Sequence, residues 1–313
     1  MKIKVGVVQE VPVFFDKHRT IDKLESIVEE YSKQKCQLLV FPESFIPGYP
    51  RGFDFGAVVG SRSQAGKELF LKYHQESIAL GSQELERIVA ISRKHNVYLV
   101  IGVTEKSDVH GSLYCSMLYI SPEAGLLGVH RKIKPTGTER VIWAEDDGSS
   151  LVTFDTKLGK LGGLICWENY MPLARMAMYK KGVEIYIAPT ADSRKEWTST
   201  MKHIALEGRC FVLASNQYFT LEHYPAEYRA LVDGQATDFC EGGSMIVSPF
   251  GEIIAGPLFG SAGVLTAEID LDQIQQSKLD FDPAGHYHRP DIFHFEVKDQ
   301  PDIKKEITSK PSS

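Results

Sequence analysis

The chain has 313 residues and a formal net charge of −6 at pH 7, with 43% hydrophobic and 24% charged residues. These proportions are typical of a globular protein whose core folds without disulfide or metal support. No apolar run reaches the roughly 18 residues that a membrane helix needs. The first residues alternate between apolar and polar as in a strand and lack the continuous apolar region of a signal peptide. No stripe of basic residues indicates binding to nucleic acid. We therefore expect neither a membrane nor a nucleic acid as a partner.

The five cysteines form no obvious pair or metal motif. They lie far apart in the sequence, at Cys36, Cys115, Cys166, Cys210 and Cys240. Without a Cys-x-x-Cys pair there is no sign of a zinc or redox site, and a reduced, cytoplasmic location is the simplest interpretation. The odd number raises the question whether one of these thiols is a nucleophile.

The first half of the chain alternates between strand and helix patterns. Short apolar or alternating runs predict strands, and apolar residues on one face predict helices. The turn Ser-Pro-Glu-Ala-Gly joins the last two of these strands as a hairpin. The predicted strands are 3–9, 37–41, 97–103, 113–120 and 126–132, and the predicted helices are 18–33, 66–79 and 83–95, with a loop at 44–64.

The second half continues this alternation and ends in a polar tail. The predicted strands are 151–155, 161–166, 183–188, 210–215, 244–248, 252–255 and 264–269, and the predicted helices are 172–181 and 193–207. No segment resembles an interdomain linker. We therefore expect one α/β domain over residues 1–295, with helices on the outer faces of its strands and a mobile tail at 296–313.

Three strands run directly into residues that could carry out chemistry. Glu43, Lys132 and Cys166 each stand at the end of a predicted strand, and α/β sheets place their sites at such ends. A carboxylate can take the proton of a thiol, and an ammonium favours the thiolate and later negative intermediates. Together they form a plausible nucleophile set without histidine.

Each of these residues also has an ordinary structural interpretation. A single cysteine in an apolar strand is usually inert core, and Glu43 and Lys132 could be solvated or ion-paired. Glu139, in a polar loop, could simply pair with Arg140. The spacing alone leaves these alternatives open.

Three ordered motifs make the chain recognisable. Phe-Pro-Glu-Ser-Phe-Ile-Pro-Gly-Tyr-Pro at 41–50, His-Arg-Lys-Ile-Lys-Pro-Thr at 130–136 and Cys-Trp-Glu-Asn-Tyr-Met-Pro-Leu at 166–173 resemble the nitrilase branch of the carbon–nitrogen hydrolase superfamily. The resemblance continues through the segments 188–194, 203–208 and 285–291, so it spans nearly the whole chain.

This resemblance implies a role for each candidate. It implies that Glu43 is the general base, Lys132 the stabilising ammonium, Cys166 the nucleophile and Glu139 the family's second glutamate. The other four cysteines are then expected to be structural. The resemblance implies no metal and no cofactor. The residues expected to contact the substrate are Tyr49, Thr136, Trp167, Glu168, Pro189 and Thr190.

Two departures from the usual nitrilase pattern bear on substrate choice. Gly137-Thr138 stands where many microbial nitrilases have Tyr-His, and Trp-Ala-Glu-Asp-Asp-Gly at 143–148 replaces the common Trp-Gly-Gln-Gly-Asp-Gly. Plant-type nitrilases are more similar to this chain in both the loop and the Cys-Trp-Glu-Asn segment.

The resemblance also implies an architecture and an assembly. We expect a four-layer α-β-β-α sandwich that forms a homodimer, or a larger homo-oligomer such as a spiral, through the helices at 172–181 and 193–207. The polar segment 217–240 is either an insertion used in further assembly or an ordinary surface loop.

The expected function is hydrolysis of a small organic nitrile to a carboxylic acid and ammonia. The alternatives are an amidase and a member that hydrates nitriles or cyanide to amides. A catalytically silent assembly protein is a different class of function, against which the intact Glu43, Lys132, Glu139 and Cys166 argue.

Overall fold

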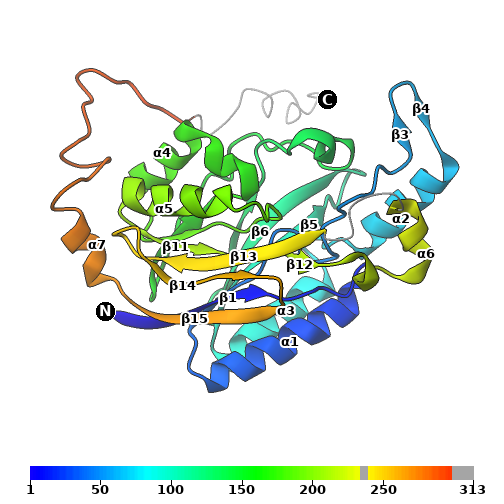
Figure 1. Ribbon diagram of the computed structural model, residues 1–313, viewed down its shortest axis with the longest axis horizontal. Coiled ribbons are helices and arrows are strands. Elements are labelled where there is room, and N and C mark those ends of the chain that lie inside the picture. Colours follow the sequence, from blue (N-terminus) through cyan, green and yellow to red (C-terminus); the bar gives the residue numbers. More distant parts are fainter. Residues whose placement is uncertain (233–238, 298–313) are drawn as a thin grey trace, which may run out of the picture.

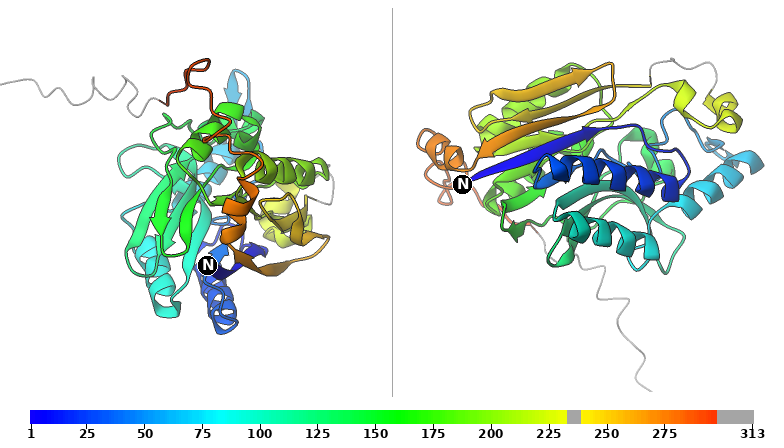
Figure 2. Two further views of the ribbon diagram at one scale, coloured as in Figure 1. Left: turned by 90° about the vertical axis from the view of Figure 1, so that its left-hand side faces the viewer. Right: turned by 90° about the horizontal axis from the view of Figure 1, so that it is seen from below.

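In the computed structural model, two β-sheets pack face to face and helices cover the outside of each (Figure 1, Figure 2). The structure describes residues 1–232 and 239–297. The predicted mobile tail therefore lies outside the described residues, except for residues 296 and 297. Among the described residues, no helix combines the length and the apolar character that a membrane crossing requires.

The first sheet has six strands in the order β15-β1-β2-β5-β6-β7. Its three central strands β1, β2 and β5 run parallel, and the flanking pairs are antiparallel. The strands are β1 (Lys2–Gln9), β2 (Leu38–Val40), β5 (Tyr98–Lys106), β6 (Leu113–Ser121), β7 (Gly125–Arg131) and β15 (Gly263–Asp270).

The second sheet has seven strands, in the order β12-β13-β11-β10-β9-β8, with β14 also paired to β13. Here β9, β10 and β11 are the parallel centre. The strands are β8 (Phe154–Thr156), β9 (Gly159–Gly163), β10 (Ile185–Ile187), β11 (Phe211–Ala214), β12 (Tyr218–Phe219), β13 (Cys240–Val247) and β14 (Ile253–Phe259).

Amphipathic helices form the outer layers. Helices α1 (Lys17–Lys33) and α3 (Gln83–His95) bury their apolar faces against the first sheet, and α4 (Pro172–Lys180) and α5 (Glu196–Gly208) bury theirs against the second. Figure 1 shows these two pairs on opposite sides of the strands. The other helices are α2 (Gln64–Glu76), α6 (Ala226–Arg229) and α7 (Asp272–Ser277), with 3₁₀ turns η1 (Gly137–Val141), η2 (Cys166–Tyr170), η3 (Leu221–His223) and η4 (Ala230–Val232).

Three hydrophobic clusters fill the spaces between the four layers. The largest lies between the two sheets and takes apolar residues from both, for example Val5 and Val100 from the first and Ile185 and Phe211 from the second. The other two lie under α1 and α3 and under α4 and α5. The four-layer α-β-β-α prediction is confirmed.

Several element predictions need correction. The segment 44–64 contains a short hairpin, β3 (Ala57–Val58) with β4 (Ser61–Arg62), and the segment 217–240 contains β12, η3, α6 and η4 where we expected an irregular loop. The predicted strand at 161–166 ends at Gly163, because the backbone turns at Cys166 into η2.

Candidate active site

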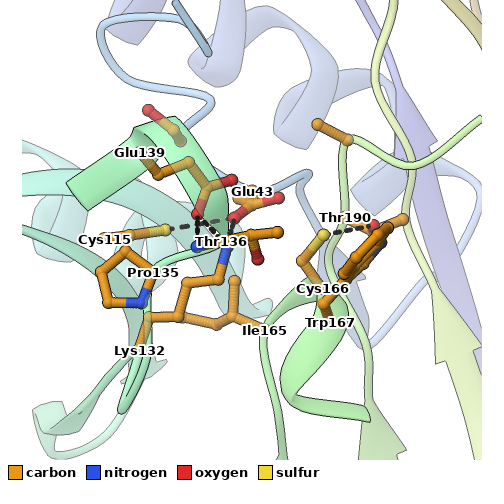
Figure 3. A network of polar contacts seen from close by, with 12 residues as sticks. Glu43, Cys115, Lys132, Pro135, Thr136, Glu139, Ile165, Cys166, Trp167 and Thr190 are labelled. Carbon is orange, nitrogen blue, oxygen red and sulfur yellow. Dashed lines mark hydrogen bonds and ion pairs between the residues drawn. The ribbon is translucent and has the colours of Figure 1, made fainter. Parts of the chain in front are cut away.

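The ends of strands from both sheets meet at one place in the molecule. Glu43 follows β2 and Lys132 follows β7 in the first sheet, while Cys166 follows β9 in the second. Figure 3 shows the Cys166 thiol on one side and the carboxylates of Glu43 and Glu139 with the Lys132 ammonium on the other. The face-to-face packing of the two sheets therefore brings Cys166 together with Glu43 and Lys132, which come from distant segments of the chain.

Lys132 lies between two glutamates. Its ammonium donates to Glu43 Oε1 at 2.7 Å and to Glu139 Oε2 at 2.7 Å. Glu139 also accepts from the Tyr49 hydroxyl at 2.7 Å and from the Thr136 backbone N–H at 2.6 Å, which holds its carboxylate on the lysine. Glu139 thus joins the site, and the alternative of a simple pair with Arg140 is wrong, because Arg140 donates to the Pro135 carbonyl instead.

Cys166 stands on a sharp turn just after β9. Its φ of 51° lies in the left-handed region, which non-glycine residues seldom adopt. The backbone N–H donates to the Pro189 carbonyl at 2.9 Å, and the Thr190 hydroxyl donates to Sγ at 3.1 Å. These contacts fix the thiol at the start of η2, and strained backbone of this kind is frequent at functional sites.

Burial and charge tune the acid–base groups of the site. Burial raises the pKa of Glu43 above its ordinary value, although Lys132 opposes this, and Glu43 Oε2 has no hydrogen-bond partner in the described part of the chain. Burial likewise raises the pKa of the Cys166 thiol, with Glu43 adding to the rise. Burial acts to lower the pKa of Lys132, but Glu43, Cys166 and Glu139 outweigh it and raise that pKa, so the ammonium stays charged.

An open cavity of about 300 Å³ leads to the thiol. Its lining includes Cys166 and Glu139, and its wall is both aromatic and charged. A neighbouring cavity of about 270 Å³ shares three of the same residues. The shared residues are Tyr49, Arg51 and Glu139. The two cavities together leave room for a small organic substrate beside the thiol.

Five of the six predicted substrate contacts line the cavity or contact Cys166. Tyr49, Thr136 and Trp167 line the cavity. Thr190 and Pro189 contact Cys166 through the hydrogen bonds described above, so they hold the nucleophile.

Glu168 is the clear correction among these predictions. Its side chain is 0% exposed, and it accepts from the backbone N–H groups of Ile133 and Ile165 and contacts the His130 ring. Neither Glu168 nor these partners line the cavity, so the geometry gives Glu168 a supporting position and does not bear out the expected substrate contact.

Four residues of the site were missed by sequence reasoning. Arg51, Asp192 and Arg194 line the cavity: Asp192 accepts from the Trp167 indole at 2.9 Å, and the Arg194 guanidinium lies over the Trp167 ring. The Cys115 thiol donates to Glu43 Oε1 at 3.4 Å. Asp192 and Arg194 fall in the recognised segment 188–194, which could have drawn attention to them, whereas nothing in an apolar strand marks Cys115.

The arrangement supports covalent catalysis by a thiol. Nucleophilic attack on a polarised carbon requires a base, a positive charge and a fixed nucleophile. Here these are the Glu43 carboxylate, the buried Lys132 ammonium and the Cys166 sulfur. Within the described ranges, no three His, Cys, Asp or Glu side chains are grouped so as to hold a metal ion.

The chain is similar to known proteins over nearly its whole length. The carbon–nitrogen hydrolase family model matches residues 4–279. Nitrilase 1 of Arabidopsis thaliana is 46% identical over 98% of this chain and 89% of its own length. The bifunctional nitrilase/nitrile hydratase NIT4A of Lupinus angustifolius is 45% identical, with coverage of 98% and 89%.

Solved structures share the fold at low sequence identity. Saccharomyces cerevisiae Nit3, a member of branch 10 of the nitrilase superfamily, superposes with a TM-score of 0.73 at 21% identity, over 92% of this chain and 97% of its own. A carbon–nitrogen hydrolase from Helicobacter pylori superposes with a TM-score of 0.72 at 22% identity, over 93% and 97%. These structures show the fold, while the family model and the relatives of 45–46% identity show that the chain belongs to the nitrilase branch of the carbon–nitrogen hydrolase family.

Proposed function

We propose that this enzyme hydrolyses a small organic nitrile to the carboxylic acid and ammonia through covalent intermediates on Cys166. The observation that supports this most directly is the fixed, buried Cys166 thiol facing the Glu43–Lys132–Glu139 cluster. The identity of 44–46% to enzymes named nitrilases supports the choice of substrate class.

The first half of the reaction forms a thioester. Glu43 takes the thiol proton, the sulfur attacks the nitrile carbon, and the nitrogen gains that proton to give a thioimidate. Water then adds to the C=N bond, and Lys132 stabilises the negative charge that develops on the new oxygen. Both protons of this water pass to the nitrogen, one as the water adds and one as the C–N bond of the tetrahedral intermediate breaks, so that ammonia leaves and the C=O bond of the thioester forms.

The second half releases the acid. Glu43 removes a proton from a second water molecule, which attacks the thioester carbonyl. The C–S bond then breaks, the sulfur regains a proton, and the carboxylic acid departs. The buried ammonium of Lys132 is placed to stabilise the negative charge on oxygen in this step as well.

Release of an amide is the second candidate outcome. If the C–S bond of the first tetrahedral intermediate breaks before the C–N bond, the products are the amide and the free thiol. The relatives named bifunctional nitrilase/nitrile hydratase favour this branch as a side reaction. An amidase would share the thioester half of the cycle.

A nitrile panel assayed for ammonia, acid and amide tests the proposal. We expect ammonia and acid from at least one nitrile, and loss of both in Cys166→Ala. Cys36→Ala, which removes a buried thiol outside the site, serves as the matched control and should retain activity. Ammonia from amides but from no nitrile would replace the nitrilase assignment with an amidase.

We also propose that the enzyme is a cytoplasmic homo-oligomer assembled through α4 and α5. These helices expose Leu173, at 71%, and Leu206, at 41%. Exposed apolar groups on neighbouring helices favour association with another copy. The five free, buried thiols are compatible with a reducing compartment.

A further inference from the structure

A buried ion pair behind the active site connects the two strand ends that supply its catalytic groups. His130 lies two residues before Lys132, and Glu168 lies two residues after Cys166. The imidazole Nε2 lies 2.9 Å from Glu168 Oε2. Both side chains are almost completely buried, with exposures of 1% and 0%. The mechanism above uses neither of them.

The Glu168 carboxylate also binds the backbone on both sides of the site. Oε1 accepts from the N–H of Ile133 at 2.6 Å, one residue after Lys132. Oε2 accepts from the N–H of Ile165 at 2.7 Å, one residue before Cys166. One side chain thus holds the segment that carries the ammonium and the turn that carries the thiol.

The surroundings of His130 determine its charge. Its Nδ1 lies 3.0 Å from the Ser150 carbonyl, which can only accept a hydrogen bond. The Ser150 hydroxyl donates to Asp146 at 2.8 Å. Because both ring nitrogens face acceptors, both carry protons, and His130 is an imidazolium paired with Glu168. Burial acts to lower the pKa of His130, but Glu168 outweighs it and the net shift is upward.

We propose that the His130–Glu168 ion pair is a positioning device that sets the separation between the Cys166 thiol and the Lys132–Glu43 pair. A buried carboxylate must be neutralised and hydrogen-bonded, and here its partners are the imidazolium and two backbone groups adjacent to catalytic residues. The pair does not touch the substrate, and it acts through the placement of the residues that do.

Part of this inference rests on the proposed nitrile hydrolysis and concerns the products. In the first tetrahedral intermediate, the C–N bond breaks only when the nitrogen is protonated, whereas the sulfur can leave as a thiolate. If Lys132 and Glu43 shift away from the intermediate, proton delivery to nitrogen slows and thiolate departure takes over. A loosened ion pair should therefore raise the fraction of amide.

Glu168→Gln tests the proposal against a matched control. Glu105→Gln removes the charge of another buried carboxylate, which lies on β5 and pairs with Arg131, the residue after His130 on β7. We expect Glu168→Gln to lower kcat by about 100-fold, the effect of misplacing a reacting group by about 1 Å, to change KM little, and to raise the amide fraction. Glu105→Gln should keep the wild-type kcat and product ratio.

Alkylation of Cys166 by iodoacetamide separates this proposal from the proposed function. The rate reports on the thiol and its neighbours without requiring a nitrile, and thermal unfolding confirms that the variants are folded. We expect slower alkylation in Glu168→Gln. We expect the same in His130→Gln, which keeps a hydrogen-bond donor toward Glu168 and serves as the test if Glu168→Gln does not fold. Wild-type alkylation rates in folded variants, or equal effects of Glu105→Gln, would overturn the positioning role even if no nitrile were hydrolysed.

Discussion

At the scale of single residues, Glu43 is an unusual carboxyl group. It is fully buried, it shares Oε1 between Lys132 and the Cys115 thiol, and its Oε2 accepts no hydrogen bond from the part of the chain that the structure describes. Burial raises its pKa, so the ionised form needed to accept a proton is lost at a higher pH than for an exposed glutamate. The rate should therefore fall on acidification through this raised pKa.

The fall of kcat/KM at low pH, the acidic limb of the pH profile, can be moved by changing the Cys115 thiol. Its hydrogen bond lowers the pKa of Glu43, so Cys115→Ala should raise that pKa and shift the acidic limb of kcat/KM to higher pH. Cys115→Ser keeps a donor and should shift the limb less. The pH dependence of kcat/KM measures both, and an unchanged limb in Cys115→Ala would show that Glu43 does not control it.

The proposed catalytic residues were easier to predict than the rest of the site. Glu43, Lys132 and Cys166 stand at strand ends inside ordered motifs, so their positions follow from the sequence. Arg51 reaches the cavity through a long-range contact, the hydrogen bond that it donates to the Ala191 carbonyl. No pattern in the sequence reveals which distant loops meet.

Glu168 shows the opposite error at this scale. Its place beside Cys166 suggested a substrate contact, but the 3₁₀ turn directs its side chain behind the cavity, where it accepts from the N–H of Ile165 at 2.7 Å. Proximity in sequence to a nucleophile does not decide on which side of a turn a side chain lies.

At the scale of elements, the packing of β5 against the Glu43 segment is especially close. A Cβ added at Gly102 would lie 2.1 Å from the Pro42 carbonyl oxygen and 2.6 Å from Glu43 Cα. Both are backbone atoms, and the Phe45 N–H also donates to the Gly102 carbonyl at 2.8 Å. The short distance between strand and loop therefore depends on a glycine.

Gly102→Ala should displace the general base. We expect kcat to fall by about 100-fold through misplacement of Glu43 and the midpoint of thermal unfolding to drop because the core is overpacked. Gly111→Ala is the control, since a Cβ there meets nothing within 4 Å. Steady-state kinetics and calorimetry check both variants, and a Gly102→Ala enzyme with normal kcat would disprove this link between strand packing and the base.

Elements with strong local signals were predicted well. The helix at 83–95 was predicted with the ends that the structure shows, because Ser82 caps its start and Asn96 adopts a left-handed conformation at its end. The short α6 and α7 were missed. Helices of four and six residues show too little periodicity to be recognised, and their positions depend on tertiary packing.

At the scale of the whole molecule, the four layers explain how distant segments form one site. Each sheet has its own helices on its outer face, so the inner faces pack against each other and their strand ends meet. The layer order could be expected from alternating strands and helices together with the resemblance. The relative placement of the two sheets could not be predicted from the sequence, because it depends on how side chains from both sheets pack in the central hydrophobic cluster.

The proposed assembly gives a prediction at this scale. Leu173→Asp places a charge on the exposed face of α4 and should reduce the assembly toward a 35.0 kDa monomer. Leu71→Asp on α2, where Leu71 is 55% exposed, is the control and should leave the mass unchanged. Sedimentation velocity distinguishes the forms, and a Leu173→Asp protein that keeps the wild-type mass would rule out α4 as the interface.

Trapping the acyl intermediate is the most direct test of covalent catalysis by Cys166. Acid quenching during turnover of a nitrile, followed by mass spectrometry of the peptide that contains Cys166, should reveal an adduct with the mass of the substrate's acyl group. We expect this adduct on Cys166 and its absence in Cys166→Ala, together with loss of ammonia release. Turnover of the nitrile by Cys166→Ala, or an adduct on a different cysteine, would contradict it.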